Sequence, residues 1–282
     1  TDLTDLADTD LVIEAVFEEL DVKQQVFAEL EQVVRPQTIL ATNTSALSVT
    51  AMAAQLQHPQ RVVGLHFFNP VAQMPLVEVV RAEHTSEAAF ATAFTVAGRC
   101  RKSAIAVSDR PGFVVNRLLI RLLGEVLGSL QNGTDVAVAD AALRPLGLPM
   151  GPFQLLQLVG PPVAKHVLDT LRARLGERYP ASPGLDAVVA AGASFVQDRD
   201  RPGADSPVDP GIGEYFGPGT NQPETAPQLL QRVRDALEQE IELMLAERVV
   251  PEQADIDLAM ILGAGWPFHL GGITPYLERS RA

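Results

Sequence analysis

The stretch LVIEAVFEELDVKQQVFAELEQVVRPQTILAT, residues 11–42, decides the fold class because it passes from a strand to a helix and back to a strand. Leu11–Phe17 is an apolar run of strand length, and the apolar residues of 22–34 then recur at helical spacing until Pro36. Residues 38–42 predict a second buried strand. Strands that alternate with helices are typical of a largely parallel sheet covered on both faces. The stretch therefore predicts an α/β domain.

The same alternation continues outward to about residue 108. Ser48 is placed to cap one further helix at its N-terminus, and Thr85 and Ser86 are placed to cap another. The elements predicted there are a helix over 49–56, strands over 61–68 and 76–80, a helix over 86–96 and a strand over 103–107. Open α/β sheets bind ligands at the carboxyl ends of their strands, so polar residues at those ends are candidate site residues.

The pattern becomes helical after Asp109. Apolar residues between 118 and 127 recur at helical spacing, and further helices are predicted over 136–146, 163–175 and 227–249. Pro161-Pro162 predicts a break before the helix over 163–175, and Gly176 predicts the end of that helix. The stretch 198–227 is rich in proline, glycine and aspartate without sustained periodicity, which predicts a long loop.

A weak internal repeat divides the helical part. Val138-Ala139-Asp140 with Gly151-Pro152-Phe153 resembles Asp255-Ile256-Asp257 with Trp266-Pro267-Phe268, and each pair follows a long predicted helix. The repeat indicates two related helical units that pack together. The predicted domains are residues 1–108 for the sheet, 109–222 for the first helical unit and 223–282 for the second.

Composition excludes several classes of function. The 282 residues include 35 acidic and 22 basic side chains, a net charge of −13, which disfavours nucleic acid and anionic membranes as partners. Cys100 is the single cysteine, so neither an internal disulfide nor a cysteine metal cluster is expected. No apolar run approaches the roughly 20 residues of a membrane span, and the N-terminal residues lack the features of a signal peptide. We therefore expect a soluble, cytoplasmic protein without a metal site.

Polar residues interrupt apolar segments at several predicted strand ends. Asn43-Thr44-Ser45 follows the strand over 38–42, and His66 lies near the end of the strand over 61–68. Such residues are ordinary in turns and at strand ends, so a purely structural role stays open. Glu78 interrupts the apolar run Leu76–Val80, and a buried carboxylate is costly unless a partner satisfies it. An imidazole is a natural partner, because a carboxylate fixes its tautomer and stabilises its charged form.

The fourth candidate segment is residues 109–117, DRPGFVVNR. Asp109 followed by Pro111 is typical of a helix cap with proline in the first turn. This prediction places Asn116 about two turns into a helix, among apolar neighbours.

Together these segments resemble the L-3-hydroxyacyl-CoA dehydrogenases of fatty-acid β-oxidation. The resemblance covers essentially the whole chain and rests on residues 10–18, 43–45, 64–70 and 109–117, in the order and spacing of that family. The doubled helical part, which ends in GAGWPFHLGG at 263–272, is similar to the multifunctional α-subunit, where an enoyl-CoA hydratase domain precedes the dehydrogenase. The resemblance implies a doubly wound, Rossmann-like sheet, NAD as the cofactor and an acyl-CoA substrate.

The resemblance also implies a role for each matching residue. His66 would be the general base that removes the hydroxyl proton while a hydride leaves C3 for NAD, and Glu78 would orient and charge-stabilise His66. Ser45 and Asn116 would hydrogen-bond the reacting oxygens of the substrate. The positions that match the lining of the cofactor site are Val16, Phe17, Glu18, Lys23, Asn43, Ser45 and Asn69.

One feature of a dinucleotide-binding domain is missing from the sequence. No Gly-x-Gly-x-x-Gly turn, which holds a pyrophosphate at a helix N-terminus, follows a predicted strand. Gly211-Ile212-Gly213 lacks the third glycine and lies in the predicted long loop. We expect the chain to be an N-terminally truncated form without its first βαβ unit, and to bind NAD very weakly by itself.

Two other functions stay open at this stage. The chain could be a non-catalytic fragment or assembly module that keeps the helical surface without holding a cofactor. It could also be a different NAD-dependent enzyme, such as a short-chain 3-hydroxybutyryl-CoA dehydrogenase or a sugar-acid dehydrogenase. The apparent duplication favours the multifunctional type, because the short-chain type usually carries one helical copy. A homodimer or a thiolase partner is implied by the resemblance alone.

Overall fold

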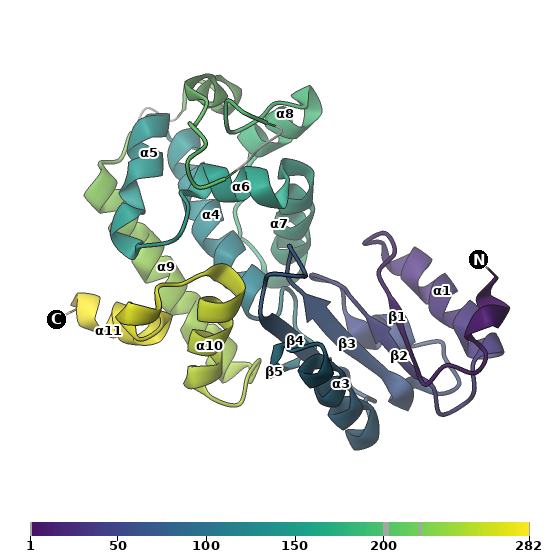
Figure 1. The fold of residues 1–282 in the computed structure, drawn as a ribbon. Helices are drawn as coiled ribbons and strands as arrows, with labels where there is room; N and C mark the ends of the chain where they lie inside the picture. Colours follow the sequence, from purple (N-terminus) through teal and green to yellow (C-terminus); the bar gives the residue numbers. More distant parts are fainter. Residues whose placement is uncertain (1, 200–202, 220–221, 282) are drawn as a thin grey trace. The chain divides into compact units, whose positions relative to one another are not determined.

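The computed structural model describes residues 2–199, 203–219 and 222–281 (Figure 1). It consists of two compact units, Thr1–Val115 with Met244–Gly263, and Asn116–Leu243 with Ala264–Ala282. The first unit holds the sheet and the second is helical. The chain is an α/β Rossmann-like domain followed by a helical domain, while the domain boundaries expected from the sequence stay a prediction.

Five strands form one sheet in the first unit. They are β1 (Leu11–Glu14), β2 (Ile39–Thr42), β3 (Val62–Phe67), β4 (Leu76–Arg81) and β5 (Ser103–Ser108), and they lie side by side in that order (Figure 1). All neighbouring strands are parallel except β3 and β4, which are antiparallel. The connection over residues 68–75 explains this departure from the predicted parallel arrangement, because a parallel crossover needs a dozen or more residues.

The helices of this unit are α1 (Leu20–Val33), α2 (Val49–Ala53), α3 (Glu87–Arg99) and α10 (Gln253–Ala264). The predicted caps of α2 and α3 are confirmed, because the Ser48 and Ser86 hydroxyls each accept a hydrogen bond from the backbone three residues on, at 3.2 Å. The loop before α10 is also bound to the sheet, since the Ser108 backbone N–H donates to the Val249 carbonyl at 2.8 Å.

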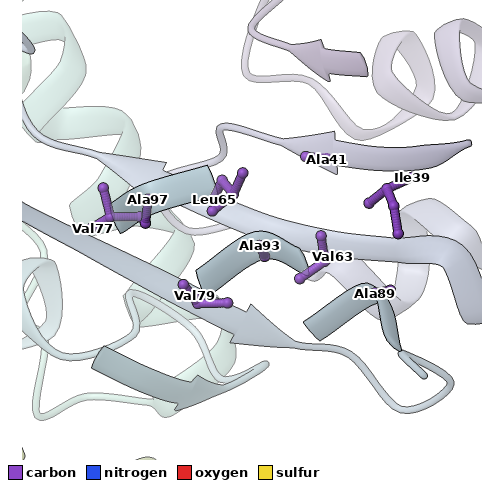
Figure 2. Close-up of a cluster of buried hydrophobic side chains, with 9 residues drawn as sticks. All are labelled: Ile39, Ala41, Val63, Leu65, Val77, Val79, Ala89, Ala93 and Ala97. Carbon is purple, nitrogen blue, oxygen red and sulfur yellow. The ribbon is translucent and has the colours of Figure 1, made fainter. Parts of the chain in front are cut away.

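One face of the sheet packs against α3 mainly through buried apolar side chains. Figure 2 shows this cluster, in which every second strand residue meets the alanine stripe of the helix. The cluster consists of Ile39, Ala41, Val63, Leu65, Val77 and Val79 from the strands and Ala89, Ala93 and Ala97 from α3. Because successive strand side chains point to opposite faces, Thr42, His66 and Glu78 lie on the other face. These three polar residues thus lie on the side of the sheet opposite the apolar cluster.

Gly64 allows α2 to lie close to that second face. A Cβ at Gly64 would stand 2.5 Å from the Val80 Cβ and 3.2 Å from a Val49 methyl carbon, which no real side chain tolerates without movement. The glycine therefore leaves room for Val80 of β4 and Val49 of α2 beside β3, two residues before His66.

Among its described residues, the helical unit contains most of α4 (Val115–Gln131), whose first residue belongs to the first unit, and six further α-helices. These are α5 (Val136–Ala142), α6 (Pro152–Val159), α7 (Pro161–Leu175), α8 (Pro183–Ala191), α9 (Ala226–Ala246, whose last turn belongs to the first unit) and α11 (Ile273–Arg281). Within the part of the chain that the structure describes, no helix combines the length and apolarity needed to cross a bilayer.

Two predicted helix starts are wrong. Asp109 does not begin a helix of its own: its carboxylate accepts hydrogen bonds from the Val49 and Thr50 backbone N–H groups at 3.0 and 2.7 Å, so it caps α2. The chain instead turns at residues 110–114, and α4 begins at Val115. Asn116 is therefore the second residue of α4 rather than one two turns inside it.

The helix predicted to start after Pro161-Pro162 instead begins at Pro161, because the first helical turn needs no backbone N–H donors. Gly176 ends that helix as predicted. The predicted long loop contains a 3₁₀ helix over Pro210–Phe216. The short helices α6 and α8 were not predicted, because their proline and glycine boundaries hide their periodicity.

The two parts that share the sequence repeat also share an order of elements. A long helix, α4 or α9, precedes a shorter one, α5 or α10. Each shorter helix is followed by a 3₁₀ turn, Arg144–Leu146 or Phe268–Leu270, and then by another helix, α6 or α11. This common order agrees with a duplication, and the relatedness of the two parts stays a prediction.

Candidate active site

A buried pair of His66 and Glu78 lies at the centre of the candidate site. The antiparallel register of β3 and β4 sets these two residues directly opposite each other. The Nδ1 atom of His66 is 2.7 Å from Oε2 of Glu78, and the two residues are 4% and 0% exposed. Neighbouring strands therefore create the pair through their register.

The second oxygen of Glu78 is also used. Oε1 accepts hydrogen bonds from the backbone N–H groups of Val114 and Val115, at 3.0 and 3.1 Å. A carboxylate held from both sides can accept a hydrogen bond from Nδ1–H of His66 in one orientation only. The second ring nitrogen, Nε2, is then left to act as a proton acceptor. Such an arrangement can serve chemically as a general base with an orienting acid.

Aromatic side chains enclose the imidazole of His66. The rings of Phe68 and Phe113 lie with their centroids 4.4 and 5.6 Å from that of His66. Phe113 is fully buried and has a φ of +48°, a backbone conformation that a bulky residue rarely adopts. Such a strained residue persists only where its surroundings over-determine it, and here it closes a wall of the histidine site.

A second buried polar network lies at the end of β1. The ammonium of Lys23 is 3.0 Å from both carboxylate oxygens of Glu14 and 3.4 Å from Oε2 of Glu18. Lys23 is 0% exposed and Glu14 is 4% exposed. Glu14 also accepts a hydrogen bond from the Thr42 hydroxyl on the adjacent strand. The network links β1, α1 and β2 at the carboxyl edge of the sheet.

Glu18 holds the loop that contains Ser45. Its Oε1 atom accepts hydrogen bonds from the Thr44 hydroxyl and the Ser45 backbone N–H, each at 2.6 Å. The Ala46 backbone N–H adds a longer contact at 3.3 Å. The position of Ser45 therefore depends on a carboxylate that is itself paired with Lys23.

Asn43 ties this loop to the strand of the histidine. Its side-chain carbonyl oxygen accepts a hydrogen bond from the Phe67 backbone N–H at 3.0 Å, and its own N–H donates to the Glu14 carbonyl at 2.9 Å. Asn43 thus connects the ends of β1, β2 and β3, and its contact on β3 is Phe67, the residue after His66.

The residues expected to line a cofactor fall into two groups. Val16 and Phe17 are 39% and 82% exposed just after β1, and Asn69 is exposed after β3. Exposed apolar side chains at the carboxyl edge of the sheet fit the flat nicotinamide end of NAD. Lys23 is different, because it is fully buried and its ammonium is already paired with carboxylates.

The pyrophosphate end of NAD is matched less well. It needs a cradle of backbone N–H groups at a glycine-rich turn, and the 282 residues contain no Gly-x-Gly-x-x-Gly sequence. The residues present therefore fit the nicotinamide end of the dinucleotide.

Asn116 belongs to the helical unit, whereas every other predicted site residue belongs to the sheet unit.

Sequence reasoning missed Glu14 and the ring of Phe113. Glu14 interrupts an apolar strand in the same way as Glu78, so the signal that identified one buried acid was present for the other. Phe113 carried no comparable signal, because its contact with His66 joins two segments distant in sequence.

Two family models match the chain. Residues 1–110 match the NAD-binding domain of 3-hydroxyacyl-CoA dehydrogenase, and residues 112–198 match the C-terminal domain of 3-hydroxyacyl-CoA dehydrogenase. The first match covers the sheet strands, β1 to β5, and the second covers the helices from α4 to α8.

Solved structures agree with these matches. The chain is similar to a 3-hydroxybutyryl-CoA dehydrogenase from Escherichia coli K12, with a TM-score of 0.79 and 27% identity over 94% of this chain and 74% of the other. It is 44% identical to FadB2 from M. tuberculosis over 68% of this chain and 69% of the other, with a TM-score of 0.63. The dehydrogenase part of multifunctional enzyme 1 from C. elegans is 25% identical, with a TM-score of 0.57 over 96% of this chain and 64% of the other.

Proposed function

The chain belongs to the 3-hydroxyacyl-CoA dehydrogenase family, whose cofactor is NAD, and from this we propose that it oxidises an L-3-hydroxyacyl-CoA to the 3-ketoacyl-CoA. The observation that carries the proposal is the buried His66–Glu78 pair, with a 2.7 Å contact between imidazole and carboxylate. Oxidation of a secondary alcohol requires a base for the hydroxyl proton, and histidine is the usual choice.

The proposed reaction assigns each proton and electron pair. When bound, NAD accepts the hydride that leaves C3 of the substrate. Nε2 of His66 takes the hydroxyl proton, and the C3–O bond becomes a carbonyl. The Glu78 carboxylate then stabilises the imidazolium that forms, while the Val114 and Val115 amides keep that carboxylate from rotating. In the reverse direction the same imidazolium returns the proton to the oxygen.

Ser45 and Asn116 are proposed to hydrogen-bond the reacting oxygens of the substrate. The Ser45 backbone is held by Glu18 at 2.6 Å, which supports a fixed direction for the Ser45 hydroxyl. Asn116 directly follows Val115, whose N–H donates to Glu78, so the sequence places it next to the residue that orients the base.

Val16, Phe17, Asn43, Ser45 and Asn69 are proposed to contact NAD near its nicotinamide end. Their support is their position at the carboxyl edge of the sheet. Glu18 and Lys23 are proposed to act at the same site through the network that holds the Ser45 loop.

We assign the reaction to fatty-acid β-oxidation in the cytoplasm, in a protein of the multifunctional type. The common order of elements around α4 and α9 supports that type, as does the likeness to the C. elegans dehydrogenase part. A homodimer or a thiolase partner is proposed from the same resemblance. The likeness to an E. coli 3-hydroxybutyryl-CoA dehydrogenase favours a second candidate, a dehydrogenase specific for four-carbon substrates.

An NADH-linked assay tests the proposal. At NADH concentrations high enough to offset the weak binding expected of this chain, acetoacetyl-CoA should oxidise NADH. L- but not D-3-hydroxybutyryl-CoA should reduce NAD, and both activities should be lost in His66→Gln. Comparing four-carbon with longer acyl-CoA substrates separates the two candidates, since the four-carbon enzyme loses activity as the chain lengthens. Binding of NAD and acyl-CoA without turnover in the parent protein would overturn the proposal and favour a binding module.

A further inference from the structure

Another buried ion pair lies in the helical unit, outside the residues assigned to the reaction. Nε of Arg117 on α4 is 2.5 Å from Oε1 of Glu240 on α9, and both side chains are 0% exposed. Removing two charges from water is costly, and apolar residues of similar volume often stabilise a protein equally well. An ion pair at this depth is therefore weak evidence for stability and points to a specific geometric role.

Two further residues contact this pair. Nε of Arg178 is 2.9 Å from Oε2 of Glu240, and the Tyr179 hydroxyl donates to the Arg117 carbonyl at 3.0 Å. Tyr179 is fully buried, and burial followed by the nearby Glu240 charge raises its pKa far above the usual tyrosine range, so the phenol stays a donor. We call Arg117, Glu240, Arg178 and Tyr179 the α4 brace.

The α4 brace acts on the first turn of α4 through both a side chain and the main chain. Asn116 lies in that turn, immediately before Arg117. The brace holds Arg117 at both its side chain and its backbone carbonyl. It therefore acts on the stretch of backbone that carries the Asn116 side chain.

A matched network exists on the same two helices, farther from Asn116. Arg121 and Glu125 on α4 pair with each other, and Arg232 on α9 pairs with Glu125. Arg121 and Glu125 are nearly buried, at 7% and 8% exposed. This network has the chemistry of the α4 brace but lies farther along α4 from Asn116, so it serves as an internal control.

We propose that Arg117 and Glu240 are positioning residues that hold Asn116 in the orientation required by the reacting oxygen of the substrate. The inference rests on the proposed role of Asn116 in binding that oxygen. Arg178 donates to the other carboxylate oxygen of Glu240, and Tyr179 donates to the backbone carbonyl of Arg117.

The first test compares Glu240→Gln with Glu125→Gln. We expect Glu240→Gln to lower kcat/KM for acetoacetyl-CoA by about tenfold, the value of one lost hydrogen bond to the substrate. Glu125→Gln should lower the unfolding temperature and leave kcat/KM within about twofold. The pH dependence of kcat should keep its shape in both variants, because His66 and Glu78 are unchanged.

A double-mutant cycle then asks whether the effect passes through Asn116. In an Asn116→Ala background, Glu240→Gln should cause no further loss, because the group that it positions is gone. If the two losses multiply instead, Glu240 acts on the enzyme by another route and the proposal is wrong. If Asn116→Ala alone keeps parent activity while His66→Gln loses it, then Asn116 does not bind the reacting oxygen. That result would contradict the proposed role of Asn116 as well as the role of the brace.

A second variant covers the case in which Glu240→Gln fails to fold. Arg117→Met with Glu240→Leu replaces the buried pair by apolar residues of similar volume, which is often neutral or stabilising. We expect cooperative unfolding near the parent temperature, about tenfold weaker binding of acetoacetyl-CoA in titration calorimetry, and the same loss of kcat/KM. Parent-like stability together with parent-like binding and kcat/KM would overturn the proposal.

Discussion

β1 and β4 each bury one carboxylate in an otherwise apolar strand, yet the two acids have different partners. Glu14 on β1 is 4% exposed and pairs with the Lys23 ammonium and the Thr42 hydroxyl. Glu78 on β4 is 0% exposed and pairs with the imidazole of His66 and two backbone amides. Both carboxylates are fully satisfied, so burial alone does not distinguish a structural acid from a chemical one.

The partner makes the difference. A lysine ammonium ordinarily keeps its charge throughout the neutral range, so its pair with a carboxylate is permanent and serves to hold elements together. An imidazole gains and loses a proton near neutrality, so a carboxylate beside it stabilises one state of a group that changes during a reaction. The comparison predicts that variants of β1 mainly change stability and that variants of β4 mainly change turnover.

The largest expected effect is on turnover at His66. His66→Gln removes the proposed base but keeps a side chain of similar size, so kcat should fall by about 10²- to 10⁴-fold. NAD affinity should be nearly unchanged, measured by titration calorimetry. A variant that turned over at the parent rate would contradict the assignment.

The next effect is at Glu78, the partner of that base. Glu78→Gln keeps an oxygen for the Val114 and Val115 amides but removes the charge that stabilises the imidazolium. We expect it to lose a large part of the His66→Gln factor. The loss in the doubly substituted enzyme should be close to that of His66→Gln alone, because residues acting as one unit cannot each be lost twice. Independent, multiplying losses in steady-state kinetics would mean that the two residues do not act together.

On β1 the corresponding change is expected in stability. Lys23→Met leaves the buried Glu14 without its cation, which should lower the free energy of unfolding by about 3–5 kcal/mol. Lys165→Met is the control, because Lys165 forms ion pairs with Asp169 and Asp186 at the surface and should cost less than about 1 kcal/mol. Denaturant unfolding of both variants measures the difference. An equal loss of unfolding free energy in the two variants would show that the buried β1 network stabilises the protein no more than a surface ion pair does.

A smaller effect is expected where the β1 network reaches the Ser45 loop. Thr44→Val removes the hydroxyl that donates to Glu18 at 2.6 Å, and should lower the free energy of unfolding by about 1–2 kcal/mol. Thr95→Val is the control, since its hydroxyl donates to the Ala91 carbonyl on the surface of α3. Thermal unfolding of the two variants decides whether the buried contact is worth more than the exposed one.

The smallest effect concerns a third acid, in the helical unit. Oδ1 of Asp140 is buried without a hydrogen-bond partner among the described residues, and this burial raises the pKa of the carboxyl despite the opposing charge of Arg144. A raised pKa in the folded state means that stability is lost as the pH rises through that value. Asp140→Asn should therefore raise the free energy of unfolding at neutral pH by less than about 1 kcal/mol. The measurement is a small rise in the unfolding temperature. The gain should vanish in acid, where both forms are neutral.

Local patterns were sufficient for most of the sheet unit. The apolar runs of strand length and the serine caps at Ser48 and Ser86 depend on neighbours within a few residues, so the sequence alone could locate them. Asp109 shows where such reasoning fails. It precedes a proline in the manner of a cap, but the N–H groups that it satisfies lie at Val49 and Thr50, about sixty positions earlier.

The candidate site divides in the same way. The cost of a buried charge made Glu78 conspicuous beside the strand-end residue His66, because a carboxylate in an apolar run demands a partner wherever it lies. Lys23 gave no such signal, since a lysine at helical spacing ordinarily reaches water, and only the packing of α1 against the sheet buries it.

The amino-acid order alone thus specified an α/β part, a helical part and a set of residues whose chemistry suits a dehydrogenase. Periodicity and the cost of burying charge are properties of residue type and short-range spacing. Pairing across the sheet required the folded chain, because the short connection after Phe68 turns β4 antiparallel and sets Glu78 opposite His66. Strand register joins residues that no local pattern connects, and it is this register that brings acid and imidazole within 2.7 Å.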